Sequence, residues 1–206
     1  MNAINARFRR FKLRALALIL SGITVLFAIV SCADRSPQSI AGLTPETVVD
    51  YIHRVIQADR TVYSKHVVDR LVNSGQFIGV SEQWQDNKTL PLPAQVMRMG
   101  AELASGKDKS DFNYHLISSW NINDVNAPKD KFEKKAMKTV EQTGLPFKGN
   151  RTIAGKRYFS ALYPDKAVVA SCVSCHNQHP VHKQRYPDKV FKPGDVMGGV
   201  LINLPL

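Results

Sequence analysis

Hydrophobic residues recur every three or four positions between residues 44 and 73, and this spacing predicts one long amphipathic helix. Its start is marked by Thr44-Pro45-Glu46, which offers an N-cap hydroxyl, a first-turn proline and an early acid. We expect the helix to run to about Asn73 and to stop at Gly75. The apolar stripe that we assign to this helix consists of Val48, Ile52, Val55 and Val62.

Shorter periodic segments follow this helix along the chain. Two of them predict short helices, at residues 94–105 and 130–141. Alternating segments predict strands at residues 112–120, 157–163 and 196–204, and a further strand is possible at 76–80. A long helix followed by intermixed strands and short helices indicates an α+β domain with an antiparallel sheet.

The first 31 residues have the layout of an export signal. Five basic residues lie between positions 7 and 14, and residues 15–30 carry no charge. The apolar segment ends in Ile29-Val30-Ser31-Cys32, which resembles a bacterial lipoprotein signal with Cys32 as the lipidated first residue of the mature protein. The alternative is an uncleaved anchor over residues 15–33. Both interpretations place the rest of the chain outside the cytoplasm, tethered to a membrane.

Composition and charge narrow the function classes. A chain of 206 residues that is 44% hydrophobic fits one folded domain with an appendage. We assign residues 32–43 to a linker and 44–206 to the domain. The net charge of +11 falls to +6 without residues 1–31, so nucleic acid is not an expected partner. Three cysteines are too few for a disulfide scaffold.

One pentapeptide carries chemistry. Cys172-Val173-Ser174-Cys175-His176 has the spacing of a c-type haem attachment site, in which two thiols add to the porphyrin vinyl groups and the histidine binds iron. It predicts one covalent haem c, held by Cys172 and Cys175, with His176 as the proximal ligand. A zinc site would need about four ligands, so His179 and His182 would have to join the two cysteines. A thiol–disulfide active site is the other alternative, although no thioredoxin-like context surrounds the pair.

The chain resembles a family of exported c-type haem domains with a PAS-like fold. The matching pieces, in order, are Leu92-Pro-Ala-Gln95, residues 116–120, Asn126-Ala-Pro128 with Glu133, Tyr158, Tyr163-Pro164, the haem pentapeptide and Gly194-Asp-Val-Met-Gly-Gly199. The resemblance covers roughly residues 44–206 and implies a PAS-like antiparallel sheet, a long N-terminal helix and one haem. Members include periplasmic sensor modules of kinases, chemoreceptors and cyclases, and stand-alone cytochromes. No transmitter segment follows Leu206, which favours a carrier or a sensor with a separate partner.

The second iron ligand is predicted from the helix pattern. Turning about 100° per residue from Val48, His66 returns to the middle of the apolar stripe, whereas His53 falls on the opposite side. His66 is therefore the first candidate and His115 the second. His179 and His182 lie close to the attachment residues and are too constrained to reach the other haem face. Met97 and Met99 are expected to be packing or surface residues rather than ligands, and Met197 is a remote candidate. Cations available for the haem propionates are Arg98, Lys156, Arg157 and Lys183.

These expectations favour one function over two others. Iron with two protein ligands suits one-electron transfer or redox sensing beside an extracytoplasmic membrane surface, with an unidentified redox or signalling protein as partner. A displaceable distal ligand would instead make the domain a sensor of diatomic gases. An enzyme such as a peroxidase would need acid–base groups that no motif announces, so we expect no catalysis.

Overall fold

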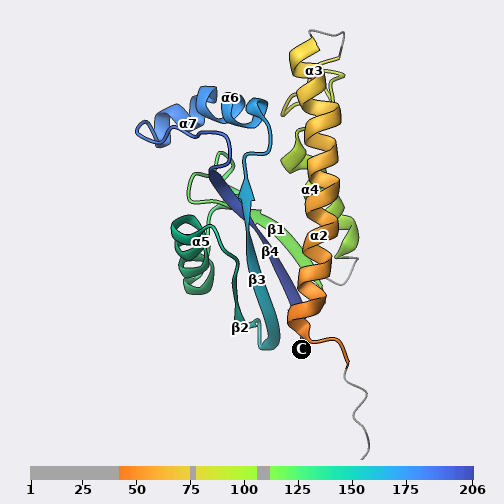
Figure 1. The fold of residues 1–206 in the computed structure, drawn as a ribbon, viewed down its shortest axis with the longest axis vertical. Helices are drawn as coiled ribbons and strands as arrows, with labels where there is room; N and C mark the ends of the chain where they lie inside the picture. The colour runs from red at the N-terminus through yellow and green to blue at the C-terminus, as the bar shows by residue number, and fades with distance from the viewer. Residues whose placement is uncertain (1–41, 75–77, 106–111) are drawn as a thin grey trace, which may run out of the picture. The chain divides into compact units, whose positions relative to one another are not determined.

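The computed structural model describes residues 42–74, 78–105 and 112–206, and residues Leu43–Leu206 form one compact unit. The unit begins with α2 (Pro45–Tyr63), which continues through the π-helical turn η1 (Ser64–Val68) into α3 (Asp69–Ser74) (Figure 1). The Thr44 hydroxyl accepts a hydrogen bond from the Thr47 amide at 3.1 Å, and Pro45 lies in the first turn. The predicted start of the helix is therefore confirmed.

Four strands form one antiparallel sheet in the order β1-β4-β3-β2. Their bounds are β1 (Asn113–Ile117), β2 (Phe147–Ile153), β3 (Lys156–Lys166) and β4 (Val196–Pro205). A two-residue hairpin turn joins β2 to β3, with positive φ at both Ala154 and Gly155. The predicted α+β class, with a PAS-like antiparallel sheet and a long N-terminal helix, is confirmed. Strand β2 was not expected, because its centre, Gly149-Asn150-Arg151, lacks the alternation of a typical strand.

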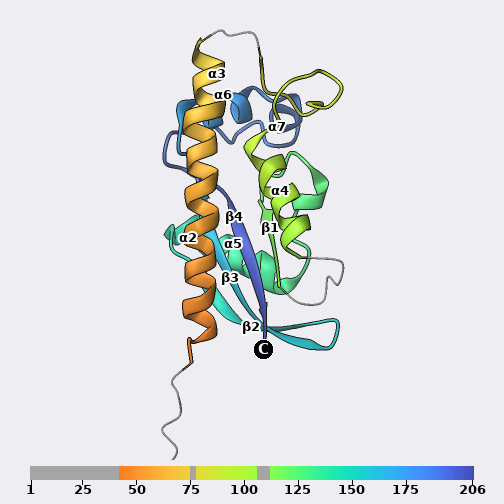
Figure 2. The same cartoon turned by 90° about the vertical axis from the view of Figure 1, so that its right-hand side faces the viewer.

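Helices cover both faces of the sheet (Figures 1 and 2). On one face lie α2 and α4 (Pro93–Ala104), and on the other lies α5 (Lys131–Thr143), which ends at Gly144 with φ of 65°. The α2 side of the core contains Val49, Met97, Ala161, Tyr163, Val200 and Ile202. The α5 side contains Ile117, Ala136, Met137, Val140, Leu162 and Leu201.

Beyond the end of the sheet where β3 finishes lie α6 (Ala170–Gln178) and α7 (Pro180–Arg185). Neither was expected as a helix. A third buried cluster, Ala167, Phe191 and Met197, packs under α6 and contacts Trp120, Cys172 and Val173. The Asn177 side chain fixes α6 to the following loop: it donates to the Phe191 carbonyl at 3.0 Å and accepts from the Phe191 amide at 2.9 Å.

The sheet-facing side of α2 differs from the predicted stripe. Val49 is fully buried and Ile52 and Ile56 pack beside it, whereas Val55 and Val62 are 62% and 57% exposed. The helix carries apolar residues on two sides, and the predicted stripe mixed them. The inward side consists of residues at four-residue intervals from Ile52 through Ile56 to Arg60, a charged residue that the hydrophobic pattern passes over.

Candidate functional site

The pentapeptide 172–176 lies within α6, so the helical geometry fixes how its side chains lie relative to one another. Cys172 and Cys175 are separated by three positions, and His176 follows Cys172 by four, which brings the three side chains to neighbouring places on the helix surface. Both cysteines are free thiols, Cys172 half-buried and Cys175 exposed. Partial desolvation, and then the nearby Cys172, raise the pKa of the Cys175 thiol. A redox-active thiol pair needs the opposite shift.

His176 is a neutral, half-buried imidazole. Its ring meets Phe191 edge-on, with centroids 6.0 Å apart and planes at 88°. Burial, with smaller effects from His182, Arg60 and His179, lowers the pKa of His176 to about 4. The Nδ1 atom of His176 is buried and has no hydrogen-bond partner among the described residues. A neutral imidazole with an uncommitted nitrogen is the form that binds a metal, so these residues fit a haem with an iron ligand at His176.

The two histidines nearest to the pentapeptide have structural partners. His182 is buried, with its Nε2 2.7 Å from the Lys189 carbonyl oxygen. His179 caps α7 by accepting from the Val181 amide at 3.2 Å, and its Nε2 lies 3.3 Å from Glu82 Oε1. Within residues 42–74, 78–105 and 112–206, no three His, Cys, Asp or Glu side chains converge to hold a metal. The four-ligand zinc alternative therefore gains no support from the geometry.

A buried ion pair lies beside α6. Arg60 of α2 reaches Asp165, at the end of β3, with 2.6 Å between Nη1 and Oδ1, and the side chains are 13% and 8% exposed. The pKa of Asp165 is raised above its ordinary value, because the effect of burial outweighs the opposing effect of the Arg60 guanidinium. Arg60 also contributes to the lowered pKa of His176, so its charge acts on the imidazole. Sequence reasoning missed Arg60 because it interrupts an apolar series.

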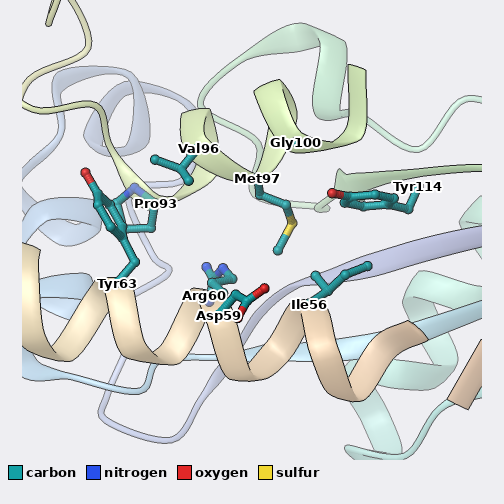
Figure 3. Close-up of a pocket in the computed structure, with 9 residues that line it drawn as sticks. All are labelled: Ile56, Asp59, Arg60, Tyr63, Pro93, Val96, Met97, Gly100 and Tyr114. Atoms are coloured by element: carbon teal, nitrogen blue, oxygen red, sulfur yellow. The ribbon is translucent and has the colours of Figure 1, made fainter. Parts of the chain in front are cut away.

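A pocket of about 170 Å³ opens between α2 and α4. Arg60, Asp59 and Ile56 line it from α2, Met97 from α4 and Tyr114 from β1 (Figure 3). Met97 is buried as a packing residue, in line with one of the two roles expected for it. Arg60 contributes to two places: it lines this pocket and also pairs with Asp165 below α6.

The candidate distal ligands are dispersed. His66 lies in the π-helical turn and is exposed. His53 faces the sheet and stacks on Tyr163, with ring centroids 3.9 Å apart. His115 points to the α5 side, where its Nε2 is 3.9 Å from Glu133 Oε1. Met197, placed last by sequence, shares a buried cluster with Cys172. The assignment of His66 stays a prediction.

The cations considered for the propionates are all on the surface. Arg98, Lys156, Arg157 and Lys183 are exposed, and Arg98 pairs with Glu102 at 3.7 Å.

The export signal, Cys32 and most of the linker lie outside the described residues. In the part that the structure describes, no helix is both long and apolar enough to cross a membrane.

The helix that carries Cys-x-x-Cys-His at one end of a PAS-like sheet is the arrangement expected of a haem-binding domain with a PAS-like fold. The model of the Tll0287-like family matches residues 43–205, and the chain is a member of that family. Among solved structures, the cyanobacterial haem protein Tll0287 is similar, with 17% identity and a TM-score of 0.46 over 79% of this chain and 97% of that one. No curated protein matches the chain.

Proposed function

We propose that the protein is an exported, membrane-tethered, mono-haem c-type cytochrome that acts in one-electron transfer or redox sensing. The observation that carries the proposal is the α6 pentapeptide, with two free thiols beside a neutral His176 whose buried Nδ1 has no described partner. Membership in the Tll0287-like family, whose namesake is a cyanobacterial haem protein, points the same way.

Each residue of the site has a part in holding the group. Cys172 and Cys175 form the thioether links, and His176 binds iron. The haem supplies a one-electron couple when it is bound. Phe191 restricts the His176 ring by edge contact, and Asn177 holds the Phe191 backbone through two hydrogen bonds. The apolar cluster of Ala167, Phe191 and Met197 excludes water below α6. Because the apolar surroundings of a haem set its solvent access and local dielectric, this cluster helps to set the reduction potential.

The attachment is tested with a visible spectrum. The full chain is expressed with its own leader in a host that matures c-type cytochromes, and the spectrum is read oxidised and reduced. A Soret band that stays with the polypeptide through acid–acetone extraction is expected, and a Cys172→Ala, Cys175→Ala variant should release its haem. A folded, colourless protein would refute the attachment and return the cysteines to thiol redox or metal binding.

The second axial ligand that we propose is His66. His66→Ala should convert a six-coordinate spectrum to a five-coordinate one, whereas Lys65→Ala, an exposed neighbour in the same π-helical turn, should leave the spectrum unchanged. An unchanged spectrum in His66→Ala would assign the ligand elsewhere, with His115 and Met197 as the next variants.

Location and partners form part of the same proposal. Residues 1–31 direct export, and Cys32 carries the lipid or residues 15–33 stay as an anchor, so the domain faces an extracytoplasmic redox or signalling protein. Neither nucleic acid nor a catalysed reaction is proposed. Cys32→Ala should shift the chain from the membrane fraction to the soluble fraction if the lipid holds it, and should leave it membrane-bound if the helix does.

A haem-based sensor of diatomic gases is the second candidate. The observation that favours it is the pocket between α2 and α4, whose 170 Å³ accommodates a small diatomic molecule beside Arg60. Carbon monoxide distinguishes the candidates: a rapid shift of the reduced Soret band supports sensing, and an unchanged band supports electron transfer.

A further inference from the structure

The outward side of α2 carries a second apolar series. Tyr51, Val55 and Val62 are 51%, 62% and 57% exposed, and Ala58 is exposed between them. With the half-buried Val48, these residues are separated by three, four, three and four positions. Scattered surface valines need no explanation, but a sustained alternation of three and four is the spacing of a coiled-coil seam. We call Val48, Tyr51, Val55, Ala58 and Val62 the outer seam.

The outer seam is separate from the contacts that hold α2 in the domain. The sheet and α4 contact the helix on its other side, through Val49, Ile52 and Ile56. The helix is therefore already formed on the domain, and a partner that covers the outer seam pays no cost of helix nucleation.

We propose that the outer seam binds a second copy of this chain in a parallel, two-stranded coiled coil. Val48, Val55 and Val62 occupy three successive a positions, and Tyr51 and Ala58 the d positions between them. Valine at a is typical of parallel two-stranded coiled coils, in which leucine usually fills the d positions; here Tyr51 and Ala58 fill them. The five layers lie against their own equivalents when two copies align in register, so the surface is complementary to itself.

Charges beside the outer seam match the same arrangement. Arg54 falls at a g position and Asp59 at the e position five residues later; both are exposed, and Asp59, which also lines the pocket beside α4, lies between the outer seam and the inward side of the helix. In a parallel pair, a g residue meets the e residue five positions on in the other helix, so Arg54 faces the partner subunit's Asp59 twice across the two-fold axis. An antiparallel pair places g beside g and offers Arg54 no such carboxylate. The Arg54 guanidinium lies 5.8 Å from the Tyr51 ring centroid, at the edge of the seam.

The π-helical turn ends the seam. It inserts an extra residue over Ser64–Val68, which breaks the heptad register, and Lys65 would occupy the next d position. The coiled coil therefore spans residues 48–62 and stops before α3, the part of the helix that contacts α6. Arg60, whose charge acts on His176, lies within this span but on the inward side of α2, opposite the outer seam.

The test is the oligomeric state of the full chain, purified in a mild non-ionic detergent and measured by sedimentation at micromolar concentration. We expect a dimer that Val55→Lys and Val62→Lys each weaken by about a hundredfold, because two buried ammonium groups meet at the interface. Val190→Lys, at a 64% exposed valine outside α2, is the matched control and should leave the dimer intact. A monomeric wild-type chain, or a dimer insensitive to both seam lysines, would overturn the proposal.

A charge exchange tests orientation and partner. Arg54→Asp and Asp59→Arg should each weaken the dimer by about tenfold, and the double variant should restore it, because the attraction is re-formed with reversed sign. Absence of rescue would overturn the parallel alignment. A wild-type chain that stays monomeric, yet needs Val55 to co-sediment with another membrane protein, would assign the seam to a different partner. None of these readouts depends on haem, so failure here leaves the proposed function standing.

Discussion

On the α5 side of the sheet the buried carboxylate of Glu133 is held by several partners and one buried polar atom, Glu141 Oε1, has none in the described residues, whereas on the α2 side several buried polar atoms have none. Glu133, 5% exposed on the α5 side, accepts from the Lys129 amide at 2.7 Å and from Arg151 at 3.3 Å. Arg151 also donates to Ser160 and Asn203. On the α2 side, buried atoms without a described hydrogen-bond partner include His53 Nε2, Gln57 Oε1 and Ser64 Oγ.

This difference between the two faces indicates that the α5 side mainly stabilises the fold, whereas the α2 side carries the groups that can take part in chemistry. The buried apolar residues of the α5 side, among them Met137, Leu162 and Leu201, are at most 1% exposed. They form a close-packed core that needs no ligand to fill it. The α2 side contains a buried ion pair, a stacked histidine and a cavity. Buried polar groups without partners are costly, so they mark the part of the molecule that a ligand or a conformational change completes.

The largest effect is expected from Arg60→Met. It leaves Asp165 as an uncompensated buried charge and should lower the free energy of unfolding by about 3–5 kcal/mol. Urea denaturation of the holoprotein measures it. Arg60→Met with Asp165→Leu should recover much of the loss, because no buried charge is then left. A single variant as stable as the wild type would show that the pair is solvated.

The same variant sharpens the comparison through the haem. Loss of a positive charge near His176 should lower the reduction potential by on the order of tens of millivolts, because the oxidised iron is then less disfavoured. Redox titration of Arg60→Met against the wild type provides the measurement, and an unchanged potential would separate Arg60 from the site.

The next largest effect is the loss of stability expected when a cavity is created on the α5 side. Leu201→Ala should cost about 3 kcal/mol of unfolding free energy, since Leu201 is fully buried among Ile117 and Leu162. The reduction potential should be unchanged, which is the opposite pattern to Arg60→Met. A shift in potential as large as that of Arg60→Met would break the distinction between the two faces.

A smaller, pH-dependent effect is expected at His53. Burial, opposed by Asp50, lowers the pKa of His53 to about 4, from an ordinary value of 6.5. Below pH 6.5 the unfolded chain binds a proton that the native imidazole refuses, so stability should fall between pH 6.5 and 4 by about 1–2 kcal/mol. His53→Phe keeps the ring stack on Tyr163 and should flatten that part of the profile, whereas an unaltered slope would assign it to other groups.

The smallest effect is expected from Tyr163→Phe. The variant removes a hydrogen bond of 2.5 Å from the Tyr163 hydroxyl to Asp50, which keeps its 2.6 Å contact with Lys148. Because the carboxylate retains that cation, the loss should be about 1 kcal/mol in thermal or urea unfolding. A loss above that of Leu201→Ala would show that the Asp50 network, rather than the aliphatic core, holds α2 to the sheet.

Local chemistry made part of this structure predictable. Thr44 caps a helix at the expected place, the helix predicted from residue 130 begins directly after Asp130, and the strands near 157–163 and 196–204 were found from their alternation. The Cys172–His176 pentapeptide could be recognised because its chemistry depends on adjacent residues.

What sequence could not give depends on long-range packing. Two apolar sides of α2 obscured which one faces the sheet, and Arg60 is inward only because Asp165 lies opposite, 105 positions later. The pocket combines α2, α4 and β1, three segments that no local pattern joins.

Strand β4 occupies the middle of the sheet although it follows α6 along the chain. Until residues 196–205 have been synthesised, β1 lacks its neighbour, and the closing pair Asn113 and Asn203 must meet across most of the domain's length. Contacts between such distant residues form slowly. Cys172 and Cys175 therefore emerge on a chain whose sheet is still open, so both thiols are accessible before folding buries Cys172 in part.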